Sequence, residues 1–352
     1  MNDDVRLRDL RAGQPVQGIY LLASRTENRG KTGKAYLQLT LSDASGTLGA
    51  KAWRPEIVPE EAAGKPVRVA GRVDEYQGAL QIIVDQVEVL DAADVPIEKL
   101  LPASQFPPAE LDARLSALLE RVQSPWIRRL LDAMLTEGDT RARLLRAPAA
   151  HGIHHAYVGG LVEHLLSMAT AFEGIRAHYA AYYPGLLDGD LVLAGIVLHD
   201  LGKIDEIDAG AGFDYTDTGR LLGHIAMGHE RAARAAARIP GFPAGVLERV
   251  QHLILAHHGE LEFGSPVRPR LIEAVLLHYL DQIDAKLNHA WARVREAPPG
   301  ATWTANTKIF DGPLMVPEAR RDEAAPAPEP LIPARKARPP KDEASLKLFP
   351  DD

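Results

Sequence analysis

Apolar and polar residues alternate along residues 15–90, and turn signals divide the alternation into short runs. In residues 34–41, four apolar side chains fall on one face and the polar side chains on the other, which predicts a half-buried strand. A turn at 43–46 leads into residues 47–53, where the alternation continues, so the two runs form a predicted hairpin. Trp53 falls on the polar face of its strand.

A second hairpin is predicted from residues 65–76 and 79–90. The apolar phase of its second strand changes near Asp85 and Gln86, as an inserted residue in a β-bulge would cause. About five short strands of this kind predict a small closed barrel.

Beyond residue 108 the apolar period changes to three and four residues, which is typical of amphipathic helices. Ser124 before Pro125 is an expected N-cap and first-turn proline. Gly159 and Gly160 lie within a helical pattern and predict a close approach to another segment or to a ligand. Helices are predicted at residues 109–122, 125–137, 220–239, 246–258 and 269–294, with a loop at 205–217.

Residues 191–203, LVLAGIVLHDLGK, form an apolar run that belongs in a core and carries His199 beside Asp200. A buried unpaired carboxylate is costly, so the run predicts a partner for Asp200. A bound metal ion would use the imidazole and the carboxylate together. A hydrogen bond between a buried histidine and its neighbour explains the dipeptide equally well, and the dipeptide alone leaves both interpretations open.

The composition limits the possible metal ligands, because the 352 residues include no cysteine. Disulfides and thiolate sites are excluded, and any metal must be held by nitrogen and oxygen atoms. Neither a signal sequence nor an apolar run of bilayer length is evident, so a cytoplasmic protein without a membrane partner is expected. The net charge of −8 argues against bulk electrostatic binding of duplex DNA but permits a local basic surface.

Such a surface is predicted on the polar face of the first hairpin, which combines Tyr36, Lys51 and Trp53 with Lys34 at its start. Residues 11–54 contain seven lysines and arginines against two acidic residues, a local charge of +5. Aromatic rings among cations can stack bases and follow phosphates, so we expect this face to bind single-stranded nucleic acid. The alternative is an edge tryptophan packed under a loop, with solvated charges around it.

The barrel segment resembles the OB-fold module of the anticodon-binding type. The residues that carry this resemblance are VQGIYLLASRTENRGKTGKAYLQLTLSDASGTLGAKAW and VRVAGRVDEYQGALQI. The resemblance covers two runs of alternating residues that the strand pattern already assigns to the barrel. It therefore implies the same fold as the periodicity does.

Potential metal ligands lie on successive predicted helices, several of them within apolar sequence. Their order, with Gly202 and Lys203 after the His-Asp pair, resembles the HD-domain superfamily of metal-dependent phosphohydrolases over residues 108–295. The resemblance implies one or two divalent ions, with Asp200 as the bridge because each of its oxygens can take one ion. The implied ligands are His164, His199 and Asp281 for one site, His224 and His257 for the other, and Asp200 for both.

Further residues near this ligand set are candidates for catalysis. Lys203, one turn beyond His199, is expected to contact a phosphate oxygen, although an exposed helix-end cation is the alternative. His155 is a second candidate phosphate contact, and His258 is a candidate proton donor or extra ligand. Asp200, Lys203 and His258 are therefore the predicted catalytic residues.

Two more side chains are expected behind the ligands. Asp284 and His278 lie one turn from Asp281 and are predicted to orient it. Imidazole with carboxylate suits manganese, iron, cobalt or zinc, and the family resemblance implies Mn²⁺.

An OB-fold in front of an HD domain is similar to the YhaM family of 3'-5' exoribonucleases across nearly the whole chain. It implies a multidomain protein in which an all-β barrel precedes an all-α HD domain. It also implies a metal-dependent exonuclease that hydrolyses single-stranded RNA, with ssDNA as a second substrate, to nucleoside 5'-monophosphates. The expected divisions are 1–95 for the barrel, 96–108 for a linker, 109–312 for the helices and 313–352 for the tail.

The tail has nine prolines in forty residues and is expected to be disordered. Its apolar residues 345–349, SLKLF, resemble peptides that dock on the bacterial sliding clamp. Two other functions stay open: a phosphohydrolase or phosphodiesterase of small nucleotides on the same metal helices, and a nucleic-acid-binding adaptor with a structural metal. The sequence leaves the oligomeric state open.

Overall fold

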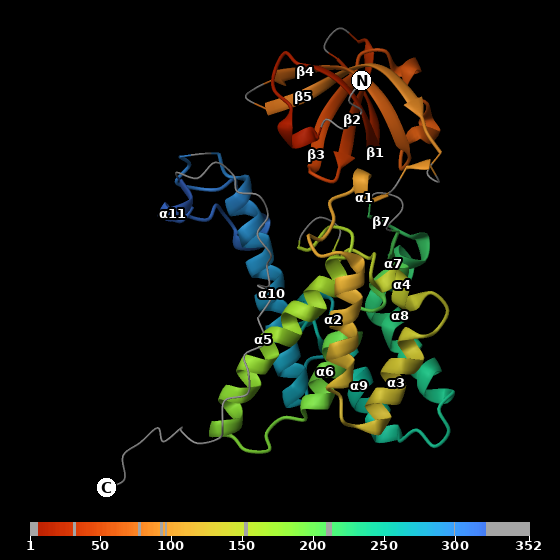
Figure 1. Ribbon diagram of the computed structural model, residues 1–352, viewed down its shortest axis with the longest axis vertical. Helices are drawn as coiled ribbons and strands as arrows, with labels where there is room; N and C mark the ends of the chain where they lie inside the picture. The colour runs from red at the N-terminus through yellow and green to blue at the C-terminus, as the bar shows by residue number, and fades with distance from the viewer. Residues whose placement is uncertain are drawn as a thin grey trace.

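The computed structural model places a β-barrel above a bundle of helices (Figure 1). It describes residues 6–30, 33–76, 79–91, 94–95, 97–150, 154–208, 213–298 and 300–321. The barrel closes in the strand order β1-β2-β3-β5-β4, and every pairing is antiparallel except that of β3 with β5. This Greek-key closure is the OB-fold topology, as predicted. The strands are β1 (Pro15–Arg29), β2 (Ala35–Asp43), β3 (Gly46–Ala52), β4 (Pro66–Tyr76) and β5 (Ala79–Val89).

Strand alternation fills the barrel interior. Leu37, Leu39 and Leu41 of β2 are fully buried, whereas the polar residues between them face outward, as the sequence pattern predicts. The expected β-bulge is also present. The β4–β5 register moves from Ala70 opposite Gln86 to Gly71 opposite Val84, which leaves Asp85 as the inserted residue.

The helical part begins after a connector and contains one hydrophobic core (Figure 1). The predicted N-cap is confirmed, because the Ser124 side chain accepts from the backbone N–H of Ile127. The helices are α1 (Ile97–Leu100), α2 (Pro108–Glu120), α3 (Pro125–Leu135), α4 (Thr140–Leu144), α5 (Gly160–Tyr182), α6 (Gly189–Leu198), α7 (Lys203–Glu206), α8 (Asp217–Ala237), α9 (Ala244–Ala256), α10 (Ile272–Glu296) and α11 (Glu318–Arg321).

Helix α6 lies at the centre of this core, in contact with α3, α5, α9 and α10. Each residue from Leu191 to Leu198 is buried, which explains why its sequence is apolar on all sides. The helix ends at Leu198, so His199 and Asp200 occupy the turn that follows rather than a helix interior. That turn is buried among the surrounding helices.

The segment predicted as a loop at 205–217 contains secondary structure. Glu206 ends α7, and strands β6 (Ile207–Asp208) and β7 (Asp214–Tyr215) pair as a short hairpin. The loop prediction was wrong there because tertiary packing, rather than local propensity, fixes the hairpin. Ile207 is buried between the barrel and the helices.

A small apolar cluster joins the two parts of the molecule. Leu21 of β1 packs with Leu100 of α1, with Val158 before α5, and with Ile207 and Phe213 of the β6–β7 region. The connector predicted at 96–108 therefore contains a short helix that belongs to this contact. The barrel is held against the bundle through α1 and through Ile207, which follows the end of α7 (Figure 1).

The C-terminal part differs from the expectation at its start. The sequence predicts disorder from residue 313 onward, but Thr304 and Leu314 exchange hydrogen bonds and Val316 is buried. Residues 322–352, including the SLKLF segment, lie outside the described residues. Among the helices that are described, none has both the length and the apolar character required to cross a membrane.

Candidate metal centre

The predicted metal ligands come from five helical segments and meet at one buried place in the bundle. His164 lies in the second turn of α5, and the His199–Asp200 turn follows α6. His224 comes just after a kink at Gly223 in α8, where the backbone φ is +73°. His257 caps the C-terminus of α9, and Asp281 lies within α10. All six side chains are buried.

Asp200 lies between the histidines. Its Oδ2 is 3.4 Å from Nε2 of His199, and its Oδ1 is 3.4 Å from Nε2 of His224 and 3.6 Å from Nε2 of His257. The two carboxylate oxygens therefore face different imidazoles. This arrangement suits a carboxylate that bridges two ions.

The remaining ligand atoms divide into two groups on either side of Asp200. His164, His199 and Asp281 have potential ligand atoms within 4.8 Å of one another, and Nε2 of His164 is 3.2 Å from Oδ1 of Asp281. His224, His257 and His258 form the second group by the same measure. The division is the one expected from the family resemblance, with His258 added.

The hydrogen bonds of the imidazoles fix which nitrogen faces inward. In each of the four histidines Nδ1 has a partner outside the centre, which favours the tautomer that leaves Nε2 as a ligand. The Nδ1 partners are Asp284 Oδ2 at 2.7 Å for His164, the Ile196 carbonyl at 3.0 Å for His199, Glu206 Oε2 at 3.0 Å for His224 and the Ile254 carbonyl at 2.7 Å for His257.

By contrast, the inward-facing atoms make no hydrogen bond of acceptable geometry within the described part of the chain. They are the Nε2 atoms of all four histidines and Oδ1 of Asp200, and each is buried. Buried polar atoms are rarely left without partners, so five that converge from separate segments indicate a missing common partner. A divalent cation fits, because nitrogen and carboxylate oxygen are the atoms that transition metals accept.

The charges at the centre favour a cation as well. Burial would raise the pKa of Asp200, but Lys203 and His199 outweigh it and hold that pKa well below its usual range. Burial lowers the pKa of His164, but its contacts with Asp281 and Asp284 raise the pKa to about 10 overall. The two carboxylates beside His164 thus make this side of the centre negative, and a cation can compensate that charge.

Lys203 has a nearer partner than the phosphate expected from the sequence. Its Nζ lies 2.6 Å from Oδ2 of Asp200, and the side chain is almost entirely buried. The alternative of an exposed helix-end cation is therefore wrong. In the structure, Lys203 stabilises the carboxylate that lies between the two groups of ligands.

Glycines allow the backbone to close around the centre. A Cβ on Gly160 would collide with the backbone oxygen of His155, and one on Gly202 would collide with that of His224. The close approach predicted for Gly160 is thus present, and it places the loop before α5 against the first turn of that helix. Gly202 similarly brings the start of α7 against α8.

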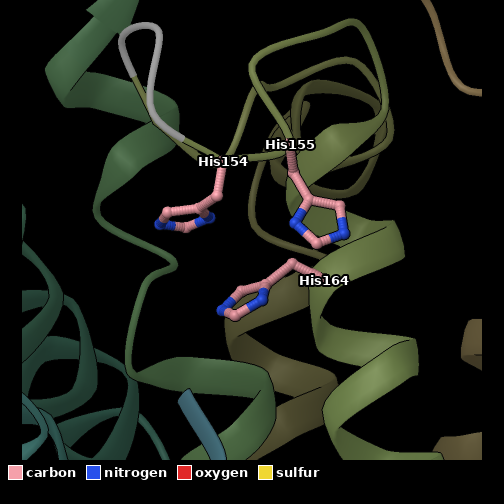
Figure 2. Close-up of side chains that lie close together, drawn as sticks. All are labelled: His154, His155 and His164. Carbon is pink, nitrogen blue, oxygen red and sulfur yellow. The ribbon is translucent and has the colours of Figure 1, made fainter. Parts of the chain in front are cut away.

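The loop before α5 contributes two histidines beside His164, as Figure 2 shows. The backbone N–H of His155 donates to Oδ1 of Asn288, and Nε2 of its ring lies 3.1 Å from Nδ2 of the same side chain. His155 is 3% exposed, so it anchors the loop and has little access to a substrate. The His154 ring lies 5.3 Å from that of His164 and is only half-buried.

His154, His155 and His164 are close enough to suggest a separate metal site. However, both nitrogens of His164 are already directed at Asp281 and Asp284. Burial and the neighbouring His164 lower the pKa of His154 to about 3, so its ring is neutral. The sequence analysis selected His155 and missed His154, because the sequence of two adjacent histidines does not show which of them faces the site.

Two side chains behind the ligands differ from their expected partners. Asp284 bonds His164 and Ser167 rather than orienting Asp281. Nδ1 of His278 donates to the backbone oxygen of His257 at 2.9 Å. His258 lies beside His257, with ring centroids 4.3 Å apart, and its Nδ1 meets the backbone oxygen of Phe263.

Glu206 is the main residue of the centre that sequence reasoning missed, because it lies in a segment interpreted as a loop. Its carboxylate accepts from the backbone N–H of His224 at 3.0 Å and also meets Nδ1 of the same residue. Such partners of metal-bound histidines fix ring orientation and basicity. A carboxylate just after the HDLGK residues was the only available signal.

Replacing Glu206 by glutamine is expected to lower metal affinity by about 10–100-fold, because the charged partner of the His224 ring is lost. Titration with a divalent ion, followed by calorimetry, measures this. Glu230→Gln is the matched control, since Glu230 lies on α8, the helix of His224, and is well exposed. An unchanged affinity in the Glu206 variant would show that His224 does not depend on this carboxylate.

On the barrel, the predicted aromatic face is present and larger than expected. The Tyr36 and Trp53 rings are 5.3 Å apart, and Nζ of Lys51 lies 5.8 Å from the Trp53 centroid. Nζ of Lys51 is closer still to Tyr76, at 4.7 Å. Trp53 and Tyr76 are more than half exposed. Lys34 is exposed just before β2.

Comparison with known proteins agrees with this architecture. The HD domain model matches residues 161–286. The 3'-5' exoribonuclease YhaM of Halalkalibacterium halodurans is 33% identical over 291 residues, which cover 82% of this chain and 88% of that protein. The chain belongs to the YhaM family of 3'-5' exoribonucleases. The family resemblance found in the sequence is therefore confirmed, and HD domains bind divalent metals.

Two solved structures of OB domains show a weak similarity to part of this chain. The second OB-fold domain of replication protein A from Methanococcus maripaludis is 20% identical, with a TM-score of 0.22, covering 25% of this chain and 94% of that one. The OB domain of a Thermoplasma acidophilum protein is 19% identical, with a TM-score of 0.20, covering 24% of this chain and 82% of that one.

Proposed function

We propose that the chain is a metal-dependent 3'-5' exonuclease that hydrolyses single-stranded RNA to nucleoside 5'-monophosphates, with ssDNA as a second substrate. The observation that carries this proposal is the convergence of five buried, unpartnered ligand atoms in a member of the YhaM family. The barrel favours a polymer over a free nucleotide, because it presents stacking surfaces remote in sequence from the ligands. A purely structural metal would not require an aspartate directed at both groups of ligands.

In this proposal, His164, His199 and Asp281 would hold one divalent ion and His224 and His257 another, with Asp200 as a ligand shared by the two groups. Manganese is the proposed ion. Bound divalent ions would supply Lewis acidity, activating water and stabilising charge on the phosphoryl oxygens. The chain's own residues orient the ligands through Asp284 and Glu206.

Lys203 keeps Asp200 ionised, which a bridging ligand requires, and supplies positive charge near the phosphate. His258 is the proposed proton donor to the departing 3'-oxygen of the shortened strand. The buried position of the centre limits competing water and strengthens these electrostatic interactions.

The test of the function uses single strands labelled at either end, incubated with the purified full-length chain and Mn²⁺. We expect mononucleotides to appear from the first time points when the label is at the 3' end. With a 5' label, the strand should shorten progressively. Release of mononucleotides from the 5' end first, or of internal fragments, would contradict the proposed polarity.

A second experiment compares the two polymers with free nucleotides. Single-stranded RNA should be consumed faster than ssDNA of the same sequence and much faster than nucleotide triphosphates or cyclic dinucleotides. Faster turnover of a free nucleotide would favour the small-molecule phosphohydrolase instead.

Replacing Trp53 or Tyr76 by alanine is expected to weaken binding of long single strands about tenfold each, because base stacking on one ring contributes about 1–3 kcal/mol. Turnover of dinucleotides should be almost unchanged, since they are too short to reach the barrel and the centre together. Fluorescence anisotropy and product release measure the two effects. Tyr182→Ala is the control, because Tyr182 is 67% exposed on α5. An equal loss on dinucleotides would count against the barrel.

His154 is the proposed substrate contact of the loop before α5. His154→Ala is expected to lower kcat by about 10–100-fold while metal content is retained, because a neutral imidazole can donate to a phosphate oxygen. His155→Ala should instead lower the melting temperature, since His155 is held by Asn288. Steady-state kinetics, metal analysis and thermal melts distinguish the two. Loss of metal from the His154 variant would instead indicate that His154 is a metal ligand.

A further inference from the structure

An exposed apolar patch lies beside the metal centre, on the segment that joins the β6–β7 hairpin to His224. We define the patch as Tyr215, Arg220, Leu221 and Leu222. Leu221 is 83% exposed and Leu222 is 57% exposed, unusually high values for two consecutive leucines. The patch residues, with Glu206 and Gly219, line an open cavity of about 620 Å³. Exposed apolar groups that line a cavity are typical of binding sites.

Glu206 contacts both the patch segment and the metal centre. The backbone N–H of Thr216 donates to the Glu206 backbone oxygen at 2.9 Å, and a Cβ on Gly219 would collide with the Glu206 backbone. The Glu206 side chain, in turn, bonds both the backbone and the ring of His224. A molecule on the patch therefore lies next to a proposed metal ligand.

The backbone turns between the patch and the centre. Gly223 has φ +73° and ψ 153°, which interrupts the helix between Leu222 and His224. As a result, Leu222 faces solvent although His224, two residues later, is buried. Because of the kink, Leu221 and Leu222 face solvent, whereas the side chain of His224 points at Asp200.

The charge of Arg220 and the aromatic ring of Tyr215 indicate which kind of molecule binds the patch. The Arg220 guanidinium lies 5.5 Å from the Tyr215 ring centroid and pairs with Asp214 at 2.7 Å. That pair is more than half exposed on both sides, so it is weak, and the guanidinium has further donors for a phosphate oxygen. An apolar surface with an aromatic ring and a cation matches the faces of bases joined by phosphates.

The position of the patch also fits a strand that passes from the barrel to the centre. Ile207, which pairs with Tyr215, packs with Leu21 of the barrel, and Phe213 joins the same cluster. The patch therefore follows directly on the barrel contact and directly precedes His224.

We infer that this patch binds the nucleotides of single-stranded RNA next to the terminal phosphodiester and guides the 3' end to the metal centre. The inference rests on the proposed exonuclease function, since it assigns the path of that enzyme's substrate. The leucines contact base faces, Arg220 contacts a phosphate, and Tyr215 limits the path on the side of the barrel.

The first test measures binding without turnover. In the full-length chain carrying Asp200→Asn, the double change Leu221→Ser and Leu222→Ser is expected to weaken binding of a short fluorescent RNA about tenfold. Leu221→Met with Leu222→Met should retain binding, because the apolar surface persists. The matched control is Ile272→Ser with Val275→Ser, which alters two aliphatic residues 48% and 43% exposed on α10.

The second test separates substrate guidance from support of His224. In the active chain, the serine pair should raise KM for RNA about tenfold, and this loss should exceed that on bis(p-nitrophenyl) phosphate at least about fivefold. Metal content should equal that of the unaltered chain. Equal losses on both substrates together with lost metal, or unchanged RNA binding, would overturn the inference. A changed molar mass by light scattering with unchanged RNA binding would assign the patch to a protein partner instead.

These outcomes are distinct from failure of the proposed function. If the unaltered chain releases no mononucleotides but the serine pair still weakens RNA binding, the patch stands and the exonuclease assignment falls. If mononucleotides are released and the serine pair has no effect on RNA, only the patch falls.

Discussion

Asp200→Asn is expected to reduce RNA hydrolysis at least about a thousandfold and to lower the bound metal content, because the amide supplies one neutral oxygen where a carboxylate supplies two charged ones. Both groups of ligands lose their shared member, since Oδ1 faces His224 and His257 and Oδ2 faces His199. Product release from labelled RNA and elemental analysis of the purified chain measure the two effects.

This variant needs a control for folding, because it also removes the partner of a buried lysine. Lys203 Nζ is 2.6 Å from Asp200, and an unpaired buried charge costs several kcal/mol. Asp200→Asn combined with Lys203→Met removes that charge and should recover thermal stability without recovering hydrolysis. RNA binding by the barrel should persist in both. Hydrolysis by a folded, metal-free Asp200 variant would refute the proposed centre.

Removal of the metal by a chelator should abolish hydrolysis, and addition of Mn²⁺ should restore it. The folded chain should also lose stability, because the ion binds the native arrangement and not the unfolded chain. At a free ion concentration of 100 times Kd, binding contributes about 2.7 kcal/mol. For helical domains of this size the melting temperature should therefore fall by roughly 5–10 °C on chelation.

A comparison of several ions separates binding of a metal from support of activity. Manganese, iron, cobalt and zinc are each added to the metal-free chain, and melting temperature and activity are recorded together. An ion that restores stability without activity occupies the ligands in an unproductive way. Retained activity in the fully metal-free chain would contradict a metal-dependent mechanism. The control is the Asp200→Asn chain, whose melting temperature should respond little to any of the ions.

The proposed ligand set follows from the family resemblance, and several of its members are polar exceptions in apolar surroundings. His164, His199 and Asp200 stand in helices or turns that are otherwise buried, so each required a partner. Strand alternation likewise predicted the barrel face with Tyr36, Lys51 and Trp53. In both cases a local pattern determines on which side of its element a residue lies.

The residues that were missed depend on contacts between distant segments. Tyr76 ends β4, and only closure of the barrel brings it to Lys51 on β3. Glu206 lies in a sequence rich in Asp and Gly, where no period distinguishes it from solvated neighbours. The structured residues 313–316 were missed for the same reason, because their order comes from pairing with residues 302–304. Local composition does not record such pairings.

Because of the apolar cluster around Leu21, separation of the two modules would expose more apolar surface on the helical part than on the barrel. A barrel produced alone would lose little, since Leu21 is the only one of its fully buried side chains in that cluster among the described residues. The helical half produced alone would expose Leu100, Leu101, Val158, Ile207 and Phe213 together, next to the segment that positions His224. The barrel therefore acts as a cover for the catalytic half, and the order of the two modules along the chain lets the cover fold first during synthesis.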